Sequence, residues 1–291
     1  MTRSRRLVIA LLINLVLAVG LLLAGRVAHS TGLVADAGHN LTDAMAILLA
    51  LIASILAARP ATERWSFGYQ RTTILAALAN GVVLVIVTVS IIWLAITRLI
   101  HPQAVHGAVV LVAAGISLAA NLAVVLLLRE GSRDLGIKSG LIHSLGDALS
   151  AAVVAIAGAI TIVAHGPVAL RVDPIASLIV AGFIVIEAFR ITGSSIHVLL
   201  EGVPIDLDIS AVRRCLCDLA GVDSVHDLHV WSLSTEQRAL SAHLIVEGDP
   251  SVSSIAPLIA DARQVLAERF AIEHATLEIE TASCAEHPTH H

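Results

Sequence analysis

Two apolar segments of this 291-residue chain carry histidine and aspartate in the same arrangement. His39 and Asp43 lie in HNLTDA, and His143 and Asp147 lie in HSLGDA. Residues four apart share a helix face, so each pair presents a nitrogen and an oxygen ligand side by side. An ionised side chain costs roughly 3 kcal/mol at the centre of a bilayer, so the groups need partners. Two such histidine–aspartate pairs that face each other would supply these partners.

Both pairs recur at a constant interval, which predicts an internal duplication of the first three spans in the last three. Two imidazoles and two carboxylates in a tetrahedron suit Zn²⁺, and the carboxylates neutralise its charge. Cu(I) prefers sulfur ligands, and Mg²⁺ or Ca²⁺ prefers a shell of oxygens. The pattern therefore predicts a zinc site, with Cd²⁺, Co²⁺, Ni²⁺ and Fe²⁺ left open.

Asp36 stands about one turn before His39 and has no counterpart in the second segment, where Gly140 takes its place. Three roles stay open for it. It supports the ligands from behind, lies on the path by which a cation enters, or only begins a helix.

Composition identifies the setting of these residues. The chain is 57% hydrophobic and 14% charged, with a mean hydropathy of +0.87, which predicts a polytopic membrane protein. A net charge of −5 without a basic block excludes general nucleic-acid binding. Six segments reach the length of about 20 residues that a crossing requires: 7–28, 34–58, 72–99, 107–128, 136–164 and 174–195.

Lysine and arginine concentrate at the N-terminus and in the links 59–71 and 129–138. By the positive-inside rule these parts lie in the cytoplasm, and so do both termini of a six-span protein. We expect three parts in the chain: a transmembrane transport domain over 1–202, a cytoplasmic domain over 203–281 and a flexible tail over 282–291.

Periodicity in the cytoplasmic part predicts the order α-β-β-α-β. The first helix is expected over 206–220 and the second from 252, with strands over 225–233, 239–246 and 274–280. The expected fold is thus a six-helix membrane domain followed by a small α/β domain.

The four membrane residues also predict a mechanism. Histidine titrates near neutral pH, and burial raises the pKa of a carboxyl, so an empty site takes up protons that arriving Zn²⁺ displaces. If the bundle opens alternately to each side, this competition couples zinc movement to opposite proton movement.

Several motifs together resemble the cation diffusion facilitator family, especially its bacterial zinc-exporting branch of the CzcD and ZitB type. They are ADAGHNLTD, RWSFGYQRTTILAALANG, LIHSLGDALSA, DPIASLIVAG, SIHVLLEGVP and VHDLHVW. The resemblance implies Zn²⁺/H⁺ antiport by a homodimer in the inner membrane, with a metallochaperone-like cytoplasmic domain. Thr73 and Leu94 replace acids that relatives usually carry, which puts accessory cation paths there in doubt.

The family often binds further metal in its cytoplasmic domain. By resemblance, the matching positions here are His226, His243 and either Glu278 or Glu280. Strand alternation predicts that His229 faces away from His226. The tail residues Cys284 and His287 are expected to bind metal weakly or not at all.

Two other functions are alternatives to transport. A metal-responsive receptor would bind metal without moving it. An intramembrane metalloenzyme is disfavoured because the chain contains no HExxH motif, and because four protein ligands leave no open position on the metal. We expect a secondary transporter, not an enzyme.

Overall fold

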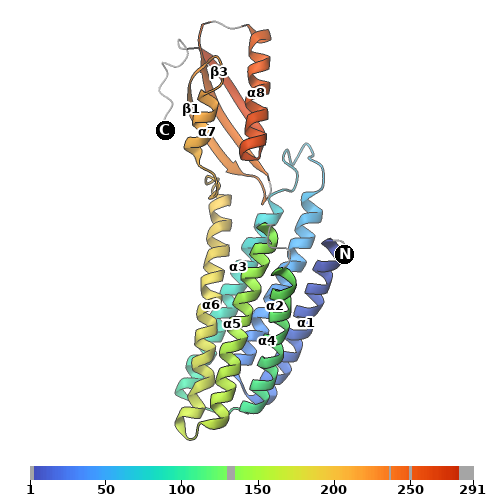
Figure 1. Ribbon diagram of the computed structural model, residues 1–291, viewed down its shortest axis with the longest axis vertical. Coiled ribbons are helices and arrows are strands. Elements are labelled where there is room, and N and C mark those ends of the chain that lie inside the picture. The colour runs from blue at the N-terminus through green and yellow to red at the C-terminus, as the bar shows by residue number, and fades with distance from the viewer. Residues whose placement is uncertain (1–2, 130–134, 236, 249–250, 282–291) are drawn as a thin grey trace. The chain divides into compact units, whose positions relative to one another are not determined.

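The computed structural model describes residues 3–129, 135–235, 237–248 and 251–281, without the side chains of residues 3–11, 127–129, 135–140, 252 and 254. The chain divides into two compact units: Met1–Ile52 with Ala76–Thr192, and Ala53–Leu75 with Gly193–His291. Six long helices come first along the chain (Figure 1): α1 Arg3–Ala28, α2 Thr31–Ala57, α3 Thr72–Ile100, α4 Gly107–Arg129, α5 Leu135–Val163 and α6 Pro167–Leu199.

The helices expose apolar side chains and bury small ones. Val16, Trp93 and Phe189 are each about two-thirds or more exposed, whereas Ala35 and Ala181 have no exposed surface. Among the described residues, α2 to α6 are long and apolar enough to cross a membrane, and the described apolar part of α1 is Leu12–Ala28. Small residues inside and large apolar residues outside are what a lipid solvent requires. The predicted polytopic helical domain is confirmed.

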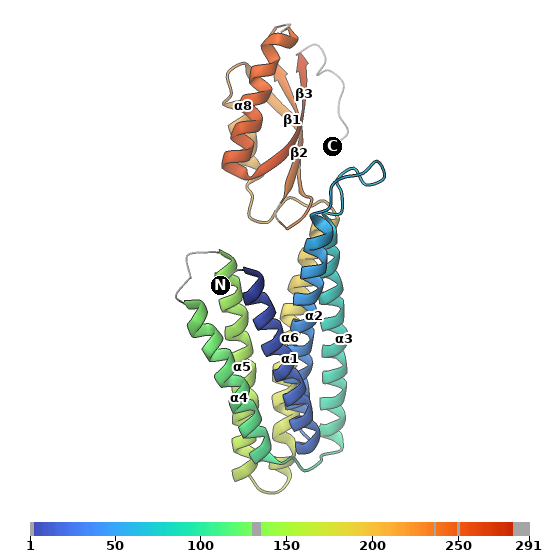
Figure 2. The same ribbon diagram turned by 90° about the vertical axis from the view of Figure 1, so that its right-hand side faces the viewer.

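Helices α4 and α5 lie side by side in both views (Figures 1 and 2). Two glycines permit this close approach. A Cβ atom at Gly158 would stand 2.7 Å from the backbone nitrogen of Leu111, and one at Gly107 would stand 2.9 Å from the carbonyl oxygen of Gly158. Any larger residue would push the helices apart, so these glycines fix α5 against α4.

The start of α2 is held by a carboxylate from α6. Asp173 is buried, and its Oδ2 accepts hydrogen bonds from the backbone nitrogen of Thr31 at 2.7 Å and from the Thr31 hydroxyl at 2.6 Å. Its Oδ1 accepts from Ser30 and from the nitrogen of Gly32. Asp173 therefore satisfies the otherwise unpaired first N–H groups of α2 and adds a negative charge at the positive end of that helix.

This arrangement corrects the expected start of the sixth span. The sixth span was expected over 174–195, but α6 begins at Pro167 and contains Pro174 inside it. Pro167 occupies the first position, where its missing N–H costs nothing. The Asp173 side chain caps α2 instead of its own helix.

The C-terminal unit contains α7 Ile209–Cys217, β1 Val222–Ser232, β2 Arg238–Val246, α8 Val252–Phe270 and β3 Ile272–Thr281. The predicted order α-β-β-α-β is confirmed. The sheet has the order β1-β2-β3, with β1 antiparallel and β3 parallel to β2. Both helices pack on one face of the sheet, over a core that includes Val212, Leu216, Leu240, Leu244 and Leu266. The opposite face is left for polar side chains.

Replacing the capping carboxylate should destabilise the bundle. Asp173→Ala leaves buried donors of Ser30, Thr31 and Gly32 without their acceptor, so we expect a loss of about 2–4 kcal/mol and a lower midpoint of thermal inactivation in detergent. Asp173→Asn keeps one carbonyl acceptor, so its midpoint of thermal inactivation should lie between those of the parent and of Asp173→Ala. The exposed Asp261→Ala serves as the control. An unchanged midpoint for Asp173→Ala would show that this cap contributes nothing.

Candidate metal sites

The four residues of the two membrane motifs converge between α2 and α5. His39 Nε2 lies 3.1 Å from Asp147 Oδ1 and 3.8 Å from Asp43 Oδ2. His143 Nε2 lies 3.6 Å from Asp43 Oδ2 and 3.6 Å from Asp147 Oδ2. Each histidine thus faces both carboxylates, one on its own helix and one across the interface.

These separations suit four-coordinate binding. Bonds of about 2.0–2.1 Å place neighbouring donors of a tetrahedron about 3.3 Å apart. The four nitrogen–oxygen distances lie between 3.1 and 3.8 Å, so the donors need only small shifts to surround one cation. The same donors form few good hydrogen bonds with one another, because three of the four distances exceed the usual range.

Burial makes this arrangement costly without a cation or protons. His39, Asp43 and Asp147 are each less than one-tenth exposed. Within the described part of the chain, His39 Nδ1 and Asp43 Oδ2 are buried with no hydrogen-bond partner. A buried acceptor without a partner is destabilising, so Asp43 Oδ2 is suited to a cation.

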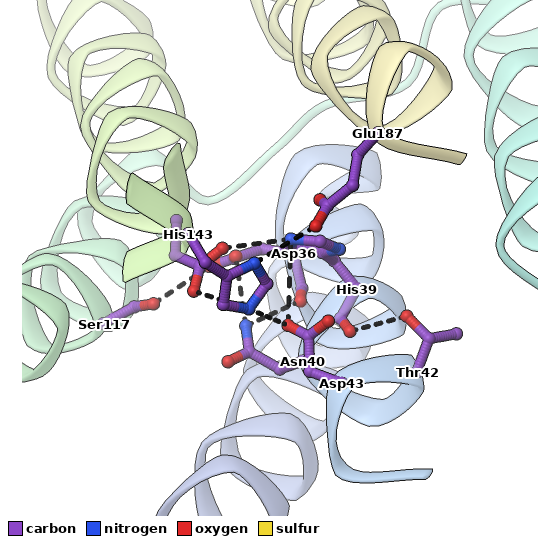
Figure 3. A network of polar contacts seen from close by, with 9 residues as sticks. Asp36, His39, Asn40, Thr42, Asp43, Ser117, His143 and Glu187 are labelled. Carbon is purple, nitrogen blue, oxygen red and sulfur yellow. Dashed lines mark hydrogen bonds and ion pairs between the residues drawn. The ribbon is translucent and has the colours of Figure 1, made fainter. Parts of the chain in front are cut away.

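Asp36 lies on the same helix but turns to another partner. It has no exposed surface, and its carboxylate accepts hydrogen bonds from Asn40 Nδ2 at 3.2 Å and from Ser117 Oγ at 3.1 Å. Ser117 lies on α4, so this contact links α4 to the turn of α2 that precedes His39 (Figure 3). Of the three roles left open for Asp36, the contact favours support of the ligand helix.

A residue outside the predicted set also reaches the cluster. Glu187 of α6 places Oε1 3.2 Å from His143 Nδ1. A cavity of about 530 Å³ opens beside these groups, and its walls include His39, His143, Asp147 and Glu187. Glu187 was not among the predicted site residues, because no spacing pattern links a single acid on α6 to a histidine on α5.

A second cluster lies on the open face of the C-terminal sheet. Glu280 bridges two histidines: its Oε2 lies 2.9 Å from His226 Nε2, and its Oε1 lies 2.7 Å from His243 Nδ1. Glu278 is more exposed and lies 3.6 Å from His243 Nε2. Of the two glutamates expected from the resemblance, Glu280 holds the central place, with Glu278 at the margin.

A break in strand β1 brings another acid to this face. The pairing of β1 with β2 shifts between His226 and His229, and Asp227 has a φ of 47°, in the left-handed region. Asp227 Oδ1 lies 3.1 Å from His229 Nε2, and its Oδ2 lies 3.6 Å from His243 Nε2. Val225, Leu228 and Val230 are buried, so the extra residue moves His229 onto the same face as His226. The prediction that His229 faces away from His226 was wrong.

Glu280 and Asp227 are charged at neutral pH. Burial raises the pKa of Glu280, but the hydrogen bonds and positive charges of His226 and His243 together outweigh it and hold the pKa below the usual value. The hydrogen bond from His229 lowers the pKa of Asp227. Both carboxylates are therefore in the form that ligates a metal.

The tail 282–291, with Cys284 and His287, lies outside the described residues, as do the side chains of the basic N-terminus. The expectations for these segments stay predictions.

Comparison with known proteins covers both parts of the chain. Residues 7–200 match the family model of the cation efflux transmembrane domain, and residues 204–282 match that of the cation efflux protein cytoplasmic domain. The zinc transporter ZitB of Escherichia coli K12 is 36% identical over 263 residues, which cover 89% of this chain and 82% of ZitB.

Two further relatives are similar over nearly the whole chain. The metal cation efflux system protein CzcD of Cupriavidus metallidurans is 34% identical over 282 residues, covering 97% of this chain and 88% of CzcD. A cadmium, cobalt and zinc/H⁺-K⁺ antiporter of Bacillus velezensis is 34% identical over 280 residues, which cover 94% of this chain and 88% of the antiporter. The resemblance to the CzcD and ZitB type is confirmed. The prediction of a transporter rather than an enzyme is confirmed as well. The chain belongs to the cation efflux family of membrane transporters.

Proposed function

We propose that the chain exports Zn²⁺ from the cytoplasm in exchange for protons, and that His39, Asp43, His143 and Asp147 bind the ion during transport. The observation that carries this proposal is the convergence of two nitrogens and two carboxylates at separations of 3.1–3.8 Å inside an apolar helix bundle. Cd²⁺ and Co²⁺ take similar ligands and are further substrates. The names of the relatives, which mention zinc, cadmium and cobalt, support this choice.

The coupling follows from competition for the same donors. A metal binds imidazole and carboxylate only when they carry no proton at the ligating atom, so loading Zn²⁺ releases protons and unloading it takes them up. The ligands form two half-sites, one on α2 and one on α5. Separation of these helices would open the site to one side at a time and complete an alternating-access cycle.

The surrounding organisation is part of the proposal. We place both termini and the C-terminal domain in the cytoplasm of a bacterial cell, with the six helices in the inner membrane, and two copies of the chain in one dimer. The His226, His243 and Glu280 cluster binds further Zn²⁺ in the C-terminal domain. Three donors from different strands within 4.8 Å of one another support this second site.

Asp147→Ala tests the transport site. The change removes one ligand and half of the carboxylate charge, so zinc uptake into inside-out vesicles should fall by more than about 100-fold while the protein stays folded and dimeric by size-exclusion chromatography. Asp261→Ala, which removes a surface carboxylate, should transport normally. Normal flux in Asp147→Ala would refute the assignment of the site.

Imposed ion gradients test the coupling. Proteoliposomes should accumulate Zn²⁺ against its gradient when the lumen is acidic, because protons leaving the lumen drive the ion in. A K⁺ gradient alone is the matched comparison, since one relative is named for both H⁺ and K⁺. Uptake that responds only to K⁺ would contradict proton exchange, and saturable binding without any flux would indicate a receptor.

Loss of the C-terminal histidines tests the second site. His226→Ala combined with His243→Ala should lower the zinc bound per chain, measured by mass spectrometry of the metal content after dialysis, and should weaken transport without abolishing it. His274→Ala removes a histidine from β3 outside the cluster and should leave the stoichiometry unchanged. If the double variant binds as much zinc as the parent, the cluster is not a metal site.

A further inference from the structure

Glu187 approaches His143 from the side opposite to Asp43 and Asp147. Its Oε1 lies 3.2 Å from His143 Nδ1, while the other ring nitrogen, Nε2, lies 3.6 Å from both Asp43 and Asp147. The two nitrogens of an imidazole point away from each other, so a carboxylate on Nδ1 does not share the cation held by Nε2. Figure 3 shows Glu187 reaching the cluster from a separate helix, α6.

The two histidines of the site are held in different ways. His39 is only 4% exposed, and its Nδ1 has no hydrogen-bond partner within the described residues, so close packing and the contact of Nε2 with Asp147 fix that ring. The His143 side chain is 36% exposed on the wall of the cavity, where packing constrains it less. The contact with Glu187 therefore constrains the orientation of the His143 ring more strongly than packing does.

Imidazole chemistry gives this contact a consequence for the metal. A neutral ring carries one N–H donor and one lone pair. A carboxylate that accepts from Nδ1–H leaves the lone pair on Nε2, turns that atom toward the metal, and makes it a stronger ligand. Partners of this kind typically change metal affinity by about 10–100-fold.

We infer that Glu187 is a positioning residue of the transport site, which holds His143 in the tautomer and orientation that present Nε2 to the cation. This inference rests on the proposed function, because it takes His143 as a ligand. It assigns to α6 an effect on cation affinity that acts through His143, although α6 supplies none of the four ligands.

Cobalt binding to the purified full-length protein tests the inference. The measurement uses the His226→Ala and His243→Ala background, so that the C-terminal cluster contributes no signal, and follows the visible absorption bands of tetrahedral Co²⁺. Glu187→Ala should weaken cobalt binding by about 10–100-fold and alter the bands. Glu187→Gln retains a carbonyl acceptor for Nδ1–H and should lose distinctly less affinity. Glu63→Gln, an exposed carboxylate in the 59–71 link, is the control.

The possible results separate the inference from its competitors. Equal losses in Glu187→Gln and Glu187→Ala would overturn it, because they would mean that charge or direct ligation matters instead of the hydrogen bond. Unchanged affinity with a lower melting temperature would also overturn it and leave Glu187 a purely structural role. Asp147→Ala in the same background tests the proposed function separately: if that variant binds Co²⁺ as the parent does, the site itself is wrong, whatever Glu187 does.

Discussion

The cost of placing charged groups in an apolar bundle governs this protein. His39, Asp43 and Asp147 are almost fully buried, and the polar atoms of these residues and of His143 face one another at distances mostly too long for good hydrogen bonds. Neighbouring carboxylates repel in such a medium unless a positive charge lies between them. In the exchange that we propose, protons on the histidines supply that charge in one state, and a divalent cation supplies it in another. The same constraint therefore explains both the selection of the cation and the exchange that we propose.

The rest of the membrane domain holds the two ligand helices in register. Asp173 fixes the first turn of α2, and Ser117 of α4 binds Asp36 one turn before His39. Gly107 and Gly158 bring α4 and α5 into backbone contact. Helices α4 and α6 therefore position the four proposed ligands without providing any of them. Their polar contacts occur where the bundle would otherwise leave buried groups unpaired.

The sequence predicted those features that depend on local spacing. The i, i+4 relation predicted that each histidine shares a helix face with its aspartate. The long apolar segments predicted the first and last residues of the six helices to within a few residues at most ends. Alternation in the C-terminal domain likewise predicted the order of its helices and strands. Each of these features follows from the period or the length of a single helix or strand.

Contacts between residues far apart in the sequence could not be predicted from local spacing. Nothing in the spacing of Asp173 indicates that it caps α2, and an Asp-Pro pair resembles the start of its own helix. Glu187 meets His143 only because α5 and α6 are neighbours at that level. The left-handed residue Asp227 shifts the phase of β1, so that His229 joins the face it was expected to leave.

Zinc X-ray absorption spectroscopy on the protein with His226 and His243 replaced by alanine would examine the transport site directly. Our account predicts one zinc in a shell of about four nitrogen and oxygen donors at 2.0–2.1 Å, two of them with the scattering pattern of imidazole. A six-coordinate shell of oxygen donors, or a spectrum without imidazole scattering, would contradict it.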